Sequence, residues 1–136
     1  MSFSEIKTLV VDDSIVIRSW TVQRLKELGF VNIDQAESGD QAFEKIVKSD
    51  KEKTPFKLVL SDWRMDNGDG PSLFKKIRSD HKFDHIVFIM ITAESEKDNV
   101  IHAISLGVAN YLVKPFEVED LKDKILSSLE RVKNEI

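Results

Sequence analysis

The chain has 136 residues, of which 41% are hydrophobic and 32% are charged, and this composition is typical of one folded globular domain rather than a disordered segment. A formal net charge of −4 disfavours nucleic-acid binding, and the lack of cysteine excludes disulfides, thiolate zinc sites and cysteine nucleophiles. No apolar run approaches the length of about 20 residues that spans a membrane, and the first residues do not resemble a secretory signal, so we expect a cytoplasmic protein.

Five short apolar runs, most of them rich in β-branched residues, predict five strands. In chain order, the runs are Ile6–Val11, Val31–Ala36, Phe56–Ser61, Ile86–Thr92 and Ala109–Val113. The fourth run is apolar without alternation, which predicts a strand buried on both faces of a parallel sheet.

Helix-period segments fill the intervals between the predicted strands. The first runs from about Ser14 to Leu28, the second opens with capping-box spacing at Ser38, the third follows Gly70-Pro71, the fourth runs from Ser95 to Gly107, and the last follows Phe116. The charged stretch 48–54 is interpreted as a solvated loop after the second helix. Strict alternation of strand and helix predicts one α/β domain over residues 1–136, with a parallel sheet and helices on both faces.

Three aspartates follow predicted strands directly. Asp12 and Asp13 come after the first strand, and Asp62 comes after the third. Sites of parallel α/β sheets form outside the carboxyl ends of the strands, so the three carboxylates converge if these strands are neighbours. Such a cluster raises a pKa or binds a cation, and hard oxygen ligands suit Mg²⁺. The alternative, that Asp12 and Asp13 only cap the first helix, leaves Asp62 unexplained.

Two further polar residues end the remaining strands. Thr92 closes the fourth strand, where its hydroxyl is placed to donate to a phosphoryl oxygen, and Lys114 closes the fifth, where its ammonium neutralises negative charge. Each residue alone is more often structural or solvated. Together with Asp62 as a nucleophile and a bound cation, they predict a phosphoryl-transfer site that works by positioning and electrostatics.

With these residues at its strand ends, the sequence resembles the receiver domains of two-component response regulators, and most of all the stand-alone receivers of chemotaxis. The matching segments are residues 9–14 (LVVDDS), 61–63 (SDW), 91–94 (ITAE) and 111–116 (YLVKPF), in the order and at the spacing of that family. The resemblance covers nearly the whole chain. It implies a flavodoxin-like parallel sheet of strand order 2-1-3-4-5 with helices on both faces. In such domains the binding site lies at the carboxyl ends of the strands.

The resemblance also implies a role for each matching residue. Asp62 accepts a phosphoryl group from a histidine kinase of chemotaxis type, assisted by Thr92 and Lys114. Mg²⁺, or Mn²⁺ in its place, is held by Asp12, Asp13, Asp62 and the backbone carbonyl of Arg64. Thr92 and Tyr111 form a switch pair, and Lys114–Pro115 is expected to be a cis peptide.

The implied partners follow from the same family. A monomeric phosphorylated chain is expected to bind an output protein, the flagellar motor switch in chemotaxis, through a face that contains Val100, Tyr111 and Lys124. A phosphatase is a further possible partner, whereas nucleic acid and membrane are not expected. Because only one helix follows Phe116, no output domain is expected within the chain.

The sequence departs from the family pattern just beyond Asp62. Asp66 stands where a proline is usual, and we interpret it as a loop acid rather than a further metal ligand. Arg64 stands where chemotaxis regulators commonly have asparagine. Arg64 and Glu94 flank the expected phosphoryl position in family geometry, so we hypothesise that they pair across it and slow the attack of water.

Other classes of protein fit the sequence less well. A phosphatase of the haloacid-dehalogenase type has its nucleophilic aspartate after the first strand, where Asp12 lies in this chain, and requires a second aspartate two residues later. Ser14 occupies that second position here. A docking module that has lost phosphorylation would not need all five site residues. A stand-alone relay receiver of another two-component pathway stays open as the alternative to chemotaxis. Whether the chain is a chemotaxis regulator or a relay receiver, it is not expected to be an enzyme, because it would promote only its own phosphoryl transfer and dephosphorylation.

Overall fold

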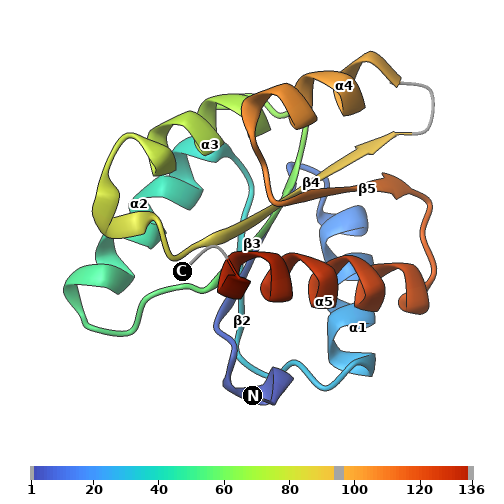
Figure 1. Ribbon diagram of the computed structural model, residues 1–136, viewed down its shortest axis with the longest axis horizontal. Helices are drawn as coiled ribbons and strands as arrows, with labels where there is room; N and C mark the ends of the chain where they lie inside the picture. The colour runs from blue at the N-terminus through green and yellow to red at the C-terminus, as the bar shows by residue number, and fades with distance from the viewer. Residues whose placement is uncertain (1, 94–96, 135–136) are drawn as a thin grey trace.

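The computed structural model describes residues 2–93 and 97–134, which form a parallel sheet between two layers of helices (Figure 1). The strands are β1 (Thr8–Val11), β2 (Ile33–Ala36), β3 (Leu58–Asp62), β4 (Val87–Ala93) and β5 (Asn110–Lys114). Their order is β2-β1-β3-β4-β5, and every neighbouring pair is parallel, as the sequence predicts. Parallel neighbours require long crossovers, and the helices supply them.

The α-helices are α1 (Ile15–Glu27), α2 (Gly39–Lys51), α3 (Gly70–Arg78), α4 (Lys97–Leu106) and α5 (Val118–Asn134). Side-chain caps begin three of them: the hydroxyls of Ser14 and Ser38 accept from the amides of Ile17 and Gln41, and Asp69 accepts from the amide of Ser72. Each cap satisfies an amide that the first turn of a helix leaves without a partner. Two short 3₁₀ turns, Phe3–Glu5 and His81–Phe83, add to the predicted elements.

The solvated loop predicted over residues 48–54 is wrong for its first half, because α2 continues to Lys51. Lysine is a good helix former, and positive charge near a helix C-terminus is favourable, so the charged residues extend the helix instead of ending it. The chain turns at Lys53, which has a φ of 63°, and the amide of Thr54 donates to the carbonyl of Ser49. The outer face of α2 is therefore longer than the sequence suggested.

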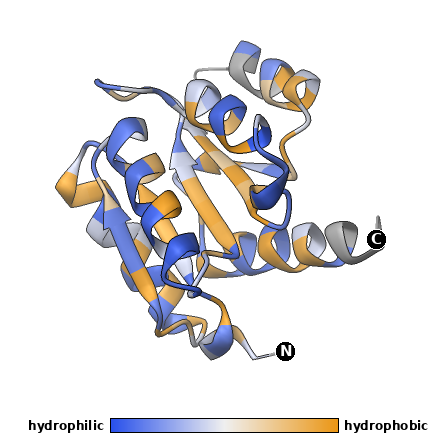
Figure 2. Cartoon of the chain, turned by 90° about the vertical axis from the view of Figure 1, so that its left-hand side faces the viewer, coloured by the Kyte–Doolittle hydropathy of each residue, from blue (hydrophilic) through white to orange (hydrophobic). Residues whose placement is uncertain are grey.

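Two apolar cores lie on the two faces of the sheet. On one face α1 and α5 pack around Leu25 and Ile125, and on the other α2, α3 and α4 pack around Ile46, Leu73 and Ala103. Figure 2 shows the hydrophobic colour along the inner strands, and hydrophobic and hydrophilic colours alternating along the helices. Residues 86–91 are all almost fully buried, which confirms that β4 is covered on both faces.

Among the described residues, no helix combines the length and the apolar character that crossing a membrane requires.

Candidate phosphoryl and metal site

The register of the sheet brings the predicted acidic residues together. Val11 of β1 lies beside Ser61 of β3, so the residues that follow them, Asp12 and Asp62, lie side by side at the carboxyl edge. One oxygen from each of Asp12, Asp13 and Asp62 lies within 4.8 Å of the others. Asp12 is buried, Asp62 is half-buried and Asp13 is exposed, so the cluster opens to solvent on the side of Asp13.

Lys114 is the cation of this cluster. Its Nζ lies 3.2 Å from Oδ1 of Asp62 and 4.0 Å from Oδ2 of Asp12. Ala93 pairs with Lys114 across β4 and β5, which puts the lysine at the same edge as the acids. The peptide bond between Lys114 and Pro115 is cis, as the sequence analysis expected.

Backbone amides hold the two inner carboxylates in place. The amide of Ser14 donates to Oδ1 of Asp12, and the amide of Trp63 donates to Oδ1 of Asp62, each at 2.9 Å. Arg18 of α1 also donates to the carbonyl oxygen of Asp12 at 2.7 Å. These supports were not predicted from the sequence. An aspartate at a strand–helix junction is a signal for the first contact, because such a side chain accepts from the amide two residues further on, here that of Ser14.

Burial raises the pKa of both inner carboxyls. For Asp62, desolvation outweighs the lowering by the charge and hydrogen bond of Lys114 and by the Trp63 amide. For Asp12, desolvation outweighs the hydrogen bond from Ser14, and the neighbouring charge of Asp62 raises the pKa further. A site whose carboxylates are costly to ionise gains from a bound cation, because a cation favours the charged forms.

The donor set fits a hard divalent cation. Carboxylate oxygens open to solvent on one side match the preference of Mg²⁺ for oxygen ligands and retained waters. Asp66 and Asp69 line a hollow of about 240 Å³ together with Asp13, Arg64 and Met65. Within the described residues, the group able to hold a metal consists of Asp12, Asp13 and Asp62, so Asp66 stays outside it.

Gly70 explains how α3 begins so close to Asp62. A Cβ atom on Gly70 would lie 2.6 Å from the carbonyl oxygen of Asp62 and 2.6 Å from Sδ of Met90. The Gly70 amide donates to the carbonyl of Trp63 at 2.9 Å. Only a glycine leaves this space, so the position of the Asp62–Trp63 segment depends on it. From the sequence, Gly70 was predicted only to precede a helix.

The loop after Asp62 is attached to the start of α2. The amide of Gly39 donates to the carbonyl of Gly68 at 2.8 Å, and the amide of Asp40 donates to the carbonyl of Asn67 at 3.1 Å. Asn67 and Gly68 have φ values of 59° and 103°, in the left-handed region. Both contacts use backbone groups, so this attachment is not visible in the residue types.

The remaining predicted residues lie around β4 and β5. Thr92 is buried at the end of β4, and Tyr111 pairs with Met90, two residues before Thr92. Side chains two apart on a strand share a face, so Thr92 and Tyr111 emerge on the same face of the sheet. Lys124 of α5 places its Nζ 4.7 Å from the centre of the half-buried Tyr111 ring.

The predicted modulators and contacts also include Arg64, Glu94 and Val100. Arg64 is exposed beside the cluster. Glu94 lies outside the described residues, and Val100 belongs to α4 but its side chain lies outside the described part of the structure.

The fold and the site together define a class: flavodoxin-like α/β domains with an acidic cluster and a lysine at the carboxyl edge of the sheet. Comparison with known families makes this specific. Residues 8–126 match the response regulator receiver domain. The chain belongs to this family, whose members are phosphorylation-switched modules of two-component regulators.

Named relatives place the chain near the chemotaxis proteins. It is 42% identical over 119 residues to the chemotaxis protein CheY1 of Helicobacter pylori, covering 88% of this chain and 93% of the relative. It is 37% identical over 126 residues to the chemotaxis protein CheY-3 of Vibrio cholerae, covering 93% of each. Among solved structures, a receiver domain protein from Clostridium thermocellum superimposes with a TM-score of 0.80 at 24% identity, covering 96% of this chain and 99% of the other, which bears on the fold alone.

Proposed function

We propose that Asp62 accepts a phosphoryl group from a phosphohistidine of a histidine kinase. The observation that carries the proposal is the placement of the Asp62 carboxylate, half-buried between the Lys114 ammonium at 3.2 Å and the Trp63 amide at 2.9 Å. A carboxylate oxygen forms the bond to phosphorus as the bond from phosphorus to the imidazole nitrogen breaks, and that nitrogen takes up a proton. Lys114 offsets the charge that the phosphoryl oxygens bring.

Asp12, Asp13, Asp62 and the carbonyl of Arg64 would hold Mg²⁺, or Mn²⁺ as a substitute. The bound ion supplies charge neutralisation at the phosphoryl oxygens. Asp12 and Asp62 are oriented for this by the amides of Ser14 and Trp63. The raised pKa of both carboxyls, caused by burial, supports the proposal because the ionised cluster needs a counter-charge.

Thr92 and Tyr111 are the proposed switch. The hydroxyl of Thr92 donates to the phosphoryl oxygen, and the Tyr111 ring turns inward on the face they share. The resulting change is read on α4, β5 and α5, with Val100, Tyr111 and Lys124 as contacts. The packing of Lys124 against the Tyr111 ring supports a coupling between the switch and this face.

Chemotaxis is the pathway that the comparisons favour, because both relatives named above are chemotaxis proteins. The proposed output partner is therefore the flagellar motor switch, and the proposed donor is a chemotaxis kinase. A stand-alone relay receiver of another two-component pathway is the second candidate. In both, residues 1–136 act as one monomeric receiver domain in the cytoplasm, and the chain promotes only its own phosphoryl transfer and dephosphorylation.

The lifetime of the phosphoryl group is proposed to depend on Arg64 and Glu94, which the geometry of the receiver family would place on either side of it, where they would pair and hinder the attacking water. Arg64 lines the hollow beside Asp13, which supports a position at the mouth of the site. A phosphatase is a further proposed partner.

The proposal is tested by incubation with acetyl phosphate and Mg²⁺, followed by intact mass measurement. We expect an adduct of about 80 Da that is absent in Asp62→Asn and in the presence of a chelator. No adduct under any condition would favour the docking-module interpretation. Multiple turnover of a diffusible phosphate ester would favour an enzyme instead.

A further inference from the structure

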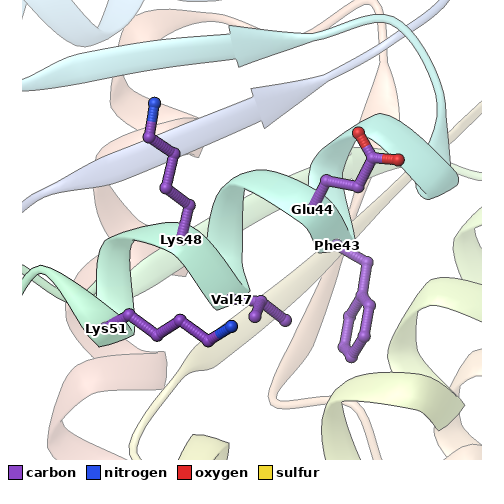
Figure 3. A pocket seen from close by; sticks show the side chains of 5 residues that line it. All are labelled: Phe43, Glu44, Val47, Lys48 and Lys51. Atoms are coloured by element: carbon purple, nitrogen blue, oxygen red, sulfur yellow. The ribbon is translucent and has the colours of Figure 1, made fainter.

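The outer face of α2 carries a shallow hollow of about 370 Å³ that the proposed function does not use. Figure 3 shows the five side chains that line it: Phe43, Glu44, Val47, Lys48 and Lys51. Spacings of four residues along α2 align Phe43, Val47 and Lys51 in one row on the helix. Lys48 and Lys51 belong to the part of the chain that the sequence analysis assigned to a loop.

The floor of the hollow is apolar and fixed by neighbouring elements. Phe43 and Val47 are half-buried and pack against the core. The Phe43 ring makes an edge contact with the ring of Phe83, with centroids 6.0 Å apart. Lys76 of α3 lies 5.9 Å from the centre of the Phe43 ring. An apolar group that enters the hollow therefore meets a surface that is already packed, which lowers the cost of ordering on binding.

The rim of the hollow is positive although the chain has a net charge of −4. Lys48 and Lys51 are exposed, and over residues 2–93 and 97–134 neither ammonium makes an ion pair. Glu44 adds one negative charge towards the start of the helix. The hollow thus combines an apolar floor with two available cations towards the C-terminal end of α2. Figure 3 shows Lys51 on the side of Val47 and Lys48 on the other side of the helix. This arrangement is complementary to an apolar side chain followed by carboxylates.

The position of α2 keeps this hollow apart from the face proposed for the output partner. α2 packs over β1 and β2, at one edge of the sheet, whereas α4, β5 and α5 lie at the other edge (Figure 1). One partner on α2 does not obstruct another on the opposite edge.

We propose that the α2 hollow docks a second protein through an acidic amphipathic segment. An apolar side chain of that segment rests on Phe43 and Val47, and its carboxylates pair with Lys48 and Lys51. This mode follows the general pattern in which buried apolar anchors supply affinity and charges at the rim select the partner. It does not depend on phosphorylation of Asp62.

The test uses a synthetic helical peptide with leucines four residues apart, flanked by glutamates. The same peptide with lysine at each glutamate is the control probe. Each is titrated into the isotope-labelled full chain and into Asp62→Asn, and amide shifts are followed by NMR. We expect the acidic peptide to shift resonances of α2 and the basic peptide not to. Affinity for the acidic peptide should fall about tenfold or more in the double variant Lys48→Glu, Lys51→Glu.

The matched control is Lys26→Glu with Lys57→Glu, which makes the same change in net charge at exposed lysines outside the hollow. Thermal unfolding by circular dichroism checks that both double variants are folded. The proposal is overturned if the α2 resonances do not move, if both peptides bind alike, or if both double variants bind alike. Shifts of α2 that follow protein concentration without peptide would also overturn it, by assigning the hollow to a second copy of the chain. None of these outcomes bears on phosphorylation of Asp62.

Discussion

Replacement of Lys114 by methionine isolates the electrostatic role of this residue, because methionine keeps the apolar stem and removes the charge. Unit charges 4 Å apart attract by about 1 kcal/mol in water and about 4 kcal/mol in the partly screened environment of a protein. Lys114 has two carboxylates at 3.2 and 4.0 Å, and the side chains of Lys114, Asp62 and Asp12 are 19%, 14% and 6% exposed. We therefore expect Lys114→Met to lower the free energy of unfolding by about 3 kcal/mol at neutral pH.

The loss should depend on pH in a defined direction. Burial raises the pKa of Asp62 and Asp12, so both become neutral at a higher pH than ordinary carboxyls. Once the pH falls below these raised values, Lys114 has no charged partner, and the cost of removing it should shrink. Urea unfolding with a chelator present, at neutral and acidic pH, measures this.

Lys76→Met is the matched control for this experiment. Lys76 also pairs with one carboxylate, Asp40 at 3.2 Å, but the two side chains are 51% and 58% exposed. Exposed pairs of this kind contribute about 0–1 kcal/mol. Equal losses for Lys114→Met and Lys76→Met, or a loss for Lys114→Met that does not change with pH, would refute the electrostatic account of the site.

Further predictions address the acids, the glycine and the loop. Asp62→Asn should remove part of the decline in unfolding free energy that accompanies rising pH. The pKa of Asp62 is raised in the folded protein, so the protonated carboxyl contributes stability at low pH, and this contribution is lost as the pH rises from the ordinary carboxyl pKa through the raised one. Unfolding curves measured across that pH range check it. Lys114→Met should bind Mg²⁺ more tightly than the natural chain, because the ammonium no longer competes for Asp62 and Asp12, and calorimetric titration measures this. Gly70→Ala should cost about 1–3 kcal/mol in unfolding free energy by overpacking against Asp62 and Met90, whereas Ser72→Ala, in the first turn of α3, should cost less. Arg64→Asn should shorten the lifetime of the phosphorylated chain, followed by the decay of the mass adduct; an unchanged lifetime would remove Arg64 from the account.

Much of the fold was predictable because strand and helix signals alternate clearly. All five strands and their parallel arrangement were predicted, with boundaries within about two residues, an uncertainty usual at element ends. The prediction failed where charge was taken as a sign of a loop, at residues 48–51. Charged residues occur on the outer faces of helices as readily as in loops. Only the packing of Phe43 and Val47 against the core distinguishes a continued helix from a loop at these residues.

The candidate site was predictable as far as it consists of side chains at strand ends. Asp12, Asp13, Asp62 and Lys114 converge because the sheet is parallel and its order brings β1 beside β3. The supports for these side chains are backbone groups, the amides of residues 14 and 63, and the space left by Gly70. Backbone contacts carry little residue-type signal, so they emerge only when the chain is seen folded.

The central claim is that Asp62 itself carries the phosphoryl group. Treatment of the acetyl phosphate product with borohydride reduces an aspartyl phosphate to homoserine, and peptide mass spectrometry then locates the reduced residue. The account predicts homoserine at position 62 alone, and none after treatment of Asp62→Asn. Homoserine at position 12 or 13, or a phosphoryl group on a histidine or serine with position 62 unchanged, would contradict it.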